Sequence, residues 1–164
     1  MTKVKQITQQ SGALEEKGHD VEIVYSDSGR IKARIIASEV VKKAGNEPTT
    51  EFPKGLRLYI YGADMKVESR LSANYGITYD KKDELVVRDN VIIVNIEGKK
   101  FNSEELLWRR KDRKVYSDKF VKITTKDEII YGKGFESDEQ FTNYLIKQVT
   151  GTIMKENKDF DTNL

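Results

Sequence analysis

Residue types able to perform acid–base or metal chemistry are scarce in this chain. His19 is its single histidine and lies in a polar N-terminal stretch, and the chain contains no cysteine. A catalytic triad needs a base held beside a nucleophile, and structural zinc needs a cluster of Cys or His, so neither arrangement is expected. Gly132-Lys133-Gly134 lacks the remaining positions of the phosphate-binding P-loop. We therefore expect a protein that is not an enzyme and that uses no catalytic residue, metal or cofactor.

The densest acidic group could suggest an acid–base pair or a calcium site. It consists of Asp80, Asp83 and Glu84, which stand beside Lys81 and Lys82. Charges of both signs in a short segment between apolar strands are typical of a solvated hairpin turn. We prefer that interpretation to a catalytic or metal-binding one.

The elements that would position any site are β-strands. Apolar and polar residues alternate with a period of two, as in half-buried strands, in the segments 21–25, 31–37 and 56–61. Residues 65–73 and 129–135 are further predicted strands, and residues 51–53 are a short extended segment beside Pro48 and Pro53. Turn signals separate the strands at residues 27–30, 80–83, 97–100, 110–113 and 125–127. Residues 142–149 fit a strand or a helix capped at 138–140, and we favour a strand because every preceding segment is one.

A repeat with an offset of thirty residues runs through the middle of the chain. Leu71, Ala73, Asn74, Ile77, Leu85, Val91 and Ile93 are matched without a gap by Phe101, Ser103, Glu104, Leu107, Val115, Val121 and Ile123. Such a period is the mark of a repeat architecture, in which each unit buries its apolar face against a neighbour. The unit here is a β-hairpin, so the sequence predicts an all-β fold of roughly 12–16 antiparallel strands.

The repeated apolar face is the remaining place for a function. It comprises Leu71, Ala73, Ile77, Leu85, Val87, Val91, Ile93, Phe101, Ser103, Leu107, Val115, Val121 and Ile123. Two interpretations stay open, a dry core or a groove in which Ala73 and Ser103 make room for a ligand. The alternation by itself favours the dry core. Because the sequence shows no catalytic or metal-binding group elsewhere, a groove on this face remains the best candidate for a ligand site.

Charge and hydropathy exclude several classes of partner. Lys and Arg number 29 against 27 Asp and Glu, so the net charge of +2 creates no overall field for nucleic acid or an anionic membrane. No stretch approaches the roughly 20 apolar residues of a membrane span. A charged share of 34% with a hydrophobic share of 37% suggests a large surface for the chain length, as an extended sheet has.

Several blocks resemble the LptC family and the wider OstA/Lpt superfamily. Residues 71–80 and 87–93 look like the superfamily repeat, with its apolar-x-Ala and Tyr-Asp positions, and residues 101–104 and 117–121 repeat it. Residues 24–37 resemble the opening strands of LptC proteins, and residues 130–137 resemble their late strand. Asp89 departs from the pattern, since the repeat usually has Gly there.

The resemblance implies a periplasmic lipopolysaccharide carrier of Gram-negative bacteria, folded as an elongated, V-shaped β-jelly roll. Such proteins hold lipid A acyl chains, which we expect on the apolar face named above. They accept lipopolysaccharide from the inner-membrane Lpt ABC transporter and pass it to an LptA-type bridge protein. The partners dock at opposite sheet edges. Gly29 matches a turn glycine near the transporter end, and residues 129–153 would face the bridge protein.

The resemblance also suggests how the chain is divided. Residues 1–20 would be a mobile lead-in from which an anchor or signal has been removed, residues 21–154 the jelly roll, and residues 155–164 a polar tail. The full-length protein would be tethered to the inner membrane, and it would contact the membrane only through the missing anchor. An LptA/OstA-type bridge protein and a non-carrier extracytoplasmic β-repeat scaffold remain as alternatives.

Overall fold

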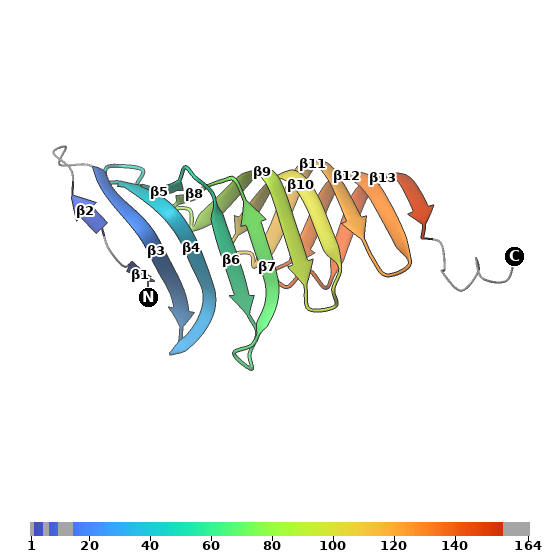
Figure 1. The fold of residues 1–164 in the computed structure, drawn as a ribbon, viewed down its shortest axis with the longest axis horizontal. Helices are drawn as coiled ribbons and strands as arrows, with labels where there is room; N and C mark the ends of the chain where they lie inside the picture. The colour runs from blue at the N-terminus through green and yellow to red at the C-terminus, as the bar shows by residue number, and fades with distance from the viewer. Residues whose placement is uncertain (1, 5–6, 10–14, 156–164) are drawn as a thin grey trace, which may run out of the picture.

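A computed structural model describes residues 2–4, 7–9 and 15–155, and these form a single antiparallel sheet of thirteen strands (Figure 1). The strands are β1 (Thr2–Val4), β2 (Ile7–Gln9), β3 (Glu15–Asp27), β4 (Arg30–Lys43), β5 (Thr49–Phe52), β6 (Leu56–Tyr61), β7 (Val67–Ala73), β8 (Tyr75–Tyr79), β9 (Glu84–Asn95), β10 (Lys100–Arg109), β11 (Lys114–Thr124), β12 (Glu128–Asp138) and β13 (Tyr144–Met154). The all-β prediction and its strand number are confirmed. In the described part of the chain no helix is long and apolar enough to cross a membrane.

The sheet divides between β4 and β9 and rejoins. Residues 33–36 of β4 pair with β6, whereas residues 41–43 pair with β5. In β9, residues 92–95 pair with β7, and residues 84–88 pair with β8. We call the side containing β6 and β7 the front limb, continued by residues 21–27, 30–37, 91–95, 100–103, 121–124 and 128–132. We call the side containing β5 and β8 the back limb, continued by residues 15–19, 39–43, 84–87, 105–109, 114–117 and 135–138.

In β9, β10 and β11, bulges carry the strand from one limb into the other. In β9, three exposed residues separate buried Val87 from buried Val91, and two of them, Asp89 and Asn90, have φ angles of 66° and 55°. Asp and Asn adopt this left-handed conformation more readily than other non-glycine residues, which explains how Asp89 replaces the usual Gly. The β10–β11 ladder shifts register between Ser103 and Leu107 at the same level of the sheet.

The hydrophobic core lies between the two limbs. Phe101 of the front limb packs edge-on against Phe135 of the back limb, with ring centroids 5.6 Å apart. The thirty-residue repeat appears in this core as matched buried positions: Leu71 and Phe101, Ala73 and Ser103, Leu85 and Val115, Val91 and Val121, and Ile93 and Ile123. Burial of one face in both copies of the repeat agrees with the stacking that the repeat predicts.

Two residues of the predicted face lie on the wrong side. Ile77 and Leu107 are half-buried on the outer surface, and the inner positions belong to Gly76 and Leu106. The prediction was wrong because it continued the period of two through the bend. At these two bends successive inward residues are three positions apart, as from Ala73 to Gly76 and from Ser103 to Leu106. The one extra residue reverses which side chains face inward in the strand that follows.

The ends of the chain differ in part from the predicted division. β3 begins at Glu15, within the predicted lead-in, because residues 15–19 pair with residues 39–43. β1 and β2 pair with β3, while residues 1, 5–6 and 10–14 of the predicted lead-in lie outside the described residues, as do residues 156–164 of the predicted tail. The strand prediction for residues 142–149 is confirmed from Tyr144 onward by β13, whereas residues 142–143 belong to a turn that spans residues 139–143.

Candidate functional site between the limbs

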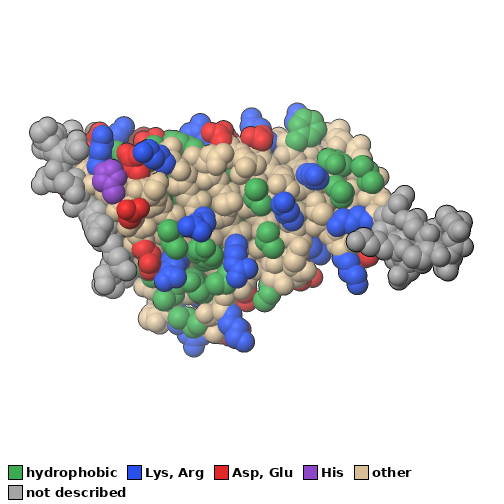
Figure 2. Space-filling model, in the orientation of Figure 1, with side chains coloured by type: hydrophobic (Ala, Val, Ile, Leu, Met, Phe, Trp, Pro, Cys, Tyr) green, Lys and Arg blue, Asp and Glu red, His purple; other side chains and the backbone are tan. Residues whose placement is uncertain are grey.

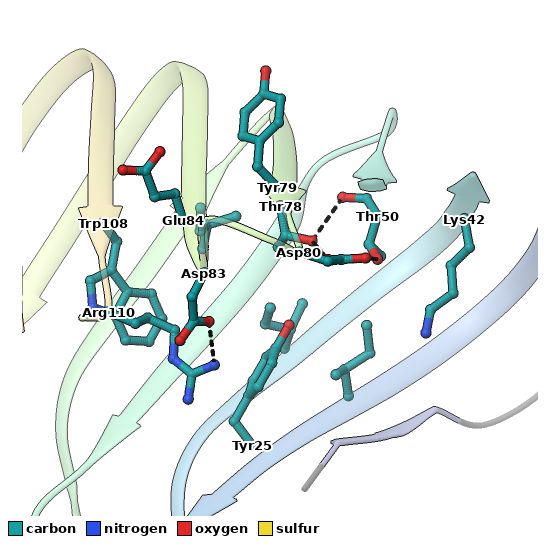
Figure 3. A pocket seen from close by; sticks show the side chains of 13 residues that line it. Tyr25, Lys42, Thr50, Thr78, Tyr79, Asp80, Asp83, Glu84, Trp108 and Arg110 are labelled. Carbon is teal, nitrogen blue, oxygen red and sulfur yellow. Dashed lines mark hydrogen bonds and ion pairs between the residues drawn. The ribbon is translucent and has the colours of Figure 1, made fainter. Parts of the chain in front are cut away.

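The space between the limbs widens into a cavity of about 230 Å³, which we call the mouth (Figure 3). Its apolar wall comes from both limbs and includes Ile23, Ile35, Leu85 and Trp108. Its polar wall contains Tyr25, Lys42, Thr50, Thr78, Tyr79, Asp80, Asp83, Glu84 and Arg110. The mouth therefore has both an apolar wall and a polar, charged wall, which suits an amphiphilic ligand.

Arg110 connects the two limbs at the mouth. It follows β10 on the back limb, and its guanidinium lies 4.7 Å from the ring centroid of Tyr25 on the front limb. Nη1 of Arg110 donates to Oδ1 of Asp83 at 2.9 Å, and the guanidinium also lies 5.9 Å from the Trp108 ring (Figure 3). The cation–π contact thus crosses the opening without a covalent link, at a strength of about 1–2 kcal/mol.

The Tyr25 hydroxyl is held in its neutral form. Burial raises the pKa of Tyr25 to about 12, Arg110 lowers it, and Asp80 and Asp83 raise it further. Asp80 itself accepts a hydrogen bond from Oγ1 of Thr78 at 2.8 Å. The mouth consequently presents a neutral phenol beside a paired guanidinium at neutral pH.

A second, smaller space extends the apolar wall inward. It measures about 10 Å³, and its lining consists of Leu58, Ile60, Leu71, Leu85, Val87, Leu106, Trp108, Val115 and Phe141. Leu85 and Trp108 border both spaces, so the apolar lining is continuous from the mouth to the core. This inner space is at the lower size limit for holding one water molecule.

The turn between β12 and β13, residues 139–143, closes the interior. The Phe141 side chain is 1% exposed and packs against Phe101, with centroids 5.5 Å apart. Nδ2 of Asn95 on the front limb donates to the Phe141 carbonyl at 2.8 Å, and Nε1 of Trp108 on the back limb donates to Glu139 at 2.8 Å. The turn therefore bonds to both limbs and fills the space between them.

Asp138 shapes this turn. Its carboxylate accepts hydrogen bonds from the backbone of Thr142 and from the side chains of Thr142 and Asn143. Burial acts to raise the pKa of Asp138, but hydrogen bonds from Asn143 and Thr142 outweigh it and hold the pKa below its ordinary value of 3.8. These bonds support the left-handed backbone of Phe141, whose φ is 59°.

A comparison with protein-family models shows which family the chain belongs to. A family model described as lipopolysaccharide-assembly, LptC-related, matches residues 19–154. The chain belongs to the LptC-related family. Family membership connects it with lipopolysaccharide transport, and no curated protein matches it closely enough to add a named relative.

The LptC-related chain also resembles a solved structure. This is LptH from Pseudomonas aeruginosa, the LptA homologous periplasmic component of the lipopolysaccharide transport device. The sequences are 14% identical, the TM-score is 0.51, and the match covers 66% of this chain and 76% of that chain. At this identity the likeness concerns the fold, and it supports the predicted β-jelly roll.

Most of the predicted apolar face of the LptC-related chain does lie between the limbs. The buried members are Leu71, Ala73, Leu85, Val87, Val91, Ile93, Phe101, Ser103, Val115, Val121 and Ile123. Leu71, Leu85, Val87 and Val115 line the two interior spaces. Val91, Ile93, Val121 and Ile123 line neither of these two spaces, and their side chains are at most 3% exposed in the core.

Other functional candidates of the LptC-related chain emerge only from the fold. Tyr25, Arg110 and Phe141 come from distant segments, and no local pattern marks them as neighbours. Trp108 was missed for the same reason as Leu106, since a period of two continued from Ser103 points it outward. Gly29 forms the predicted tight turn with Ser28, at φ angles of 78° and 54°, and is exposed.

Proposed function

We propose that this LptC-related protein is a non-enzymatic, periplasmic carrier that holds lipopolysaccharide acyl chains between its two limbs. It would accept lipopolysaccharide from the inner-membrane ABC transporter and pass it to an LptA-type bridge protein. The observation that carries the proposal is the apolar lining that Leu85 and Trp108 continue from the mouth into the core. Only non-covalent contacts join the limbs across their opening in the described residues.

The proposed ligand matches the energetics of this interior. Burying one CH₂ group contributes about 0.8 kcal/mol, so a dozen carbons contribute on the order of 10 kcal/mol before ordering costs. An apolar cavity of about 150 Å³ holds benzene, so the mouth at about 230 Å³ has room for part of one acyl chain. Longer chains require the limbs to separate, which breaks the Arg110–Tyr25 and Asn95–Phe141 contacts.

The edges of the sheet offer surfaces for the proposed partners. β13 is an edge strand with large exposed apolar residues, namely Leu145, Val149, Ile153 and Met154. We propose that the bridge protein adds a strand here, which would cover both the open backbone groups and these side chains. We place the transporter at the opposite end, near Gly29, where β1 and β2 already pair with β3. A tether to the inner membrane is part of the same proposal.

Site-specific photo-crosslinking tests the carrier proposal. A photoreactive amino acid at Leu85 or Leu106 faces the interior, whereas one at neighbouring Val86 or Leu107 faces outward and serves as the matched control. In membranes that contain the transporter and ATP, we expect lipopolysaccharide adducts at the inward positions and few at the outward ones. Equal adducts on both faces would contradict an interior site.

The same experiment distinguishes the scaffold alternative. Val91 and Ile123 are fully buried, which a dry-core scaffold explains without any ligand. Crosslinkers at these two positions report whether the limbs open far enough to admit an acyl chain. If no interior position forms an adduct with lipopolysaccharide, the result would favour the non-carrier scaffold over the carrier proposal.

A further inference from the structure

The outer surface of the front limb carries cations that lack acidic partners. Arg57, Arg70, Lys100 and Lys122 are exposed and alternate with inward residues along β6, β7, β10 and β11. None of these four forms an ion pair with a residue that the structure describes. In Figure 2 the middle of this face shows Lys, Arg and hydrophobic side chains, and Asp and Glu lie toward its margins.

Other outward cations of the sheet have acidic or aromatic partners, and on the front limb Arg34 pairs with Glu22 at 3.1 Å. Arg109 pairs with Glu84 at 2.8 Å, and Lys114 pairs with Glu136 at 2.9 Å. Arg88 lies 4.5 Å from the ring centroid of Tyr75, whose hydroxyl donates to Glu51. The net charge of +2 therefore conceals a local excess of cations without acidic partners at Arg57, Arg70, Lys100 and Lys122. The electrostatic potential at a patch of surface depends on the charges near that patch more than on the net charge of the chain.

A shallow hollow on the front limb brings two of these cations together. It measures about 140 Å³ and is lined by Arg57, Tyr59, Arg70, Leu71, Ser72, Ile92 and Val94. Tyr59 pairs with Arg70 across β6 and β7, and Arg57 pairs with Ser72, so the two arginines stand on a diagonal. Diagonal side chains lie about 7–8 Å apart at the backbone, within reach of one shared group for residues as long as Arg. Guanidinium groups bind phosphate oxygens bidentately.

We propose that the outer face of the front limb lies on an anionic phospholipid surface, with a lipid phosphate held between Arg57 and Arg70. The apolar residues of the hollow distinguish a bilayer from an acidic protein as the partner. Tyr59 suits the headgroup level, and Ile92 with Val94, which is 36% exposed, can contact the upper acyl region. This contact is additional to the anchor that the sequence led us to expect, and it does not depend on the carrier function.

Vesicle co-sedimentation of the 164-residue chain tests the proposal. The probes are phosphatidylcholine vesicles and equimolar phosphatidylcholine–phosphatidylglycerol vesicles. We expect binding only to the anionic vesicles and a loss of at least about tenfold in Arg57→Glu/Arg70→Glu, since each cation near such a surface contributes appreciably. Arg57→Gln/Arg70→Gln gives a milder variant, and the circular dichroism and melting of both report whether they fold.

The matched control is Lys111→Glu/Lys147→Glu, which changes the charge equally away from the front limb and should bind like the native chain. Equal losses in both charge-reversal variants would overturn the specific face. Failure of the native chain to bind anionic vesicles would overturn the membrane partner in favour of an acidic protein. Displacement by inorganic phosphate at an equal phosphate concentration would assign the arginine pair to free phosphate.

Discussion

Asn95 and Phe141 are joined across the opening between the two limbs. Nδ2 of Asn95, at the end of β9, donates a 2.8 Å hydrogen bond to the main-chain carbonyl of Phe141 in the β12–β13 turn. The Asn95 side chain is buried and also accepts a hydrogen bond from the Lys99 amide at 2.9 Å. One side chain thus shapes the β9–β10 turn and holds the closing turn in place.

Replacing Asn95 with Ala should loosen the closing turn. The substitution leaves the buried Phe141 carbonyl without its donor, at a cost of about 1–3 kcal/mol in the free energy of unfolding. Denaturant unfolding measures the cost, and hydrogen exchange should accelerate at residues 139–143. Asn102→Ala, on the outer face of β10, is the control and should change stability by no more than about 0.5 kcal/mol. Unchanged exchange in the turn would show that the bond does not hold it.

Replacing Phe141 with Ala should lower the stability of the fold and enlarge the space between the limbs. Phe→Ala in a packed core costs about 3–5 kcal/mol, and the lost ring would enlarge the void between Leu106 and Trp108. We expect a lower melting temperature together with tighter binding of a single-chain lipid, measured by calorimetry. Phe120→Ala is the control, because Phe120 is 63% exposed. Weaker lipid binding in a folded Phe141→Ala protein would mean that Phe141 contacts the ligand and does not exclude it.

Tyr25 should make the protein sensitive to alkali. Because its pKa rises from 10.0 to about 12 on folding, the unfolded chain loses this proton first. The stabilising contribution is therefore complete below pH 10 and is lost as the pH rises through about 12. Tyr75 shares this shift, so the comparison needs Tyr25→Phe. The native chain should lose more unfolding free energy than Tyr25→Phe over this range, and parallel curves would refute the assignment.

Asp138 should make the closing turn sensitive to acid. Its pKa lies below 3.8 in the folded chain, so its contribution is present above that value and disappears as the pH falls through the folded pKa. Fluorescence of Trp108, which bonds to Glu139 in the same turn, can follow the change. Asp138→Asn should reduce the acid response. A response identical to that of the native chain would show that other carboxylates dominate it.

Asp89→Gly should stabilise the bend of β9. Asp89 has a φ of 66°, a conformation that is less favourable for residues with a Cβ and natural for Gly. We expect a gain of up to about 1 kcal/mol in the free energy of unfolding. Lys119→Gly is the control, because Lys119 occupies the equivalent repeat position without a positive φ, and it should destabilise. Destabilisation by Asp89→Gly would show that the Asp side chain contributes more than its backbone strain costs.

Local pattern was enough to predict the strands and most of the buried face. Alternation of Val91 and Ile93, and of Val121 and Ile123, depends only on the two-residue period of a strand, and the structure buries all four. The turn at Asp27–Arg30 was equally predictable, since Gly29 supplies a left-handed conformation. The family resemblance, confirmed by the match over residues 19–154, then identified the jelly roll.

The inward-facing residues beyond the bends that follow Ala73 and Ser103 could not be predicted in the same way. Ile77 and Leu107 follow the period of two from Ala73 and Ser103, yet the bulge turns both outward. A bulge depends on how neighbouring strands meet, and a single strand sequence does not contain that information. Comparing the two repeats could not reveal the error, because both contain the same bulge.

The sequence by itself determined the all-β class, the hairpin unit and the apolar face, because these follow from contacts between residues close in the chain. Only the tertiary structure decided what lies at the opening of that face. Tyr25 meets Arg110, and Asn95 meets Phe141, because the folded-over sheet brings distant turns and strands together. The same folding brings Arg57 and Arg70 together on one face of the sheet, which the net charge alone does not reveal.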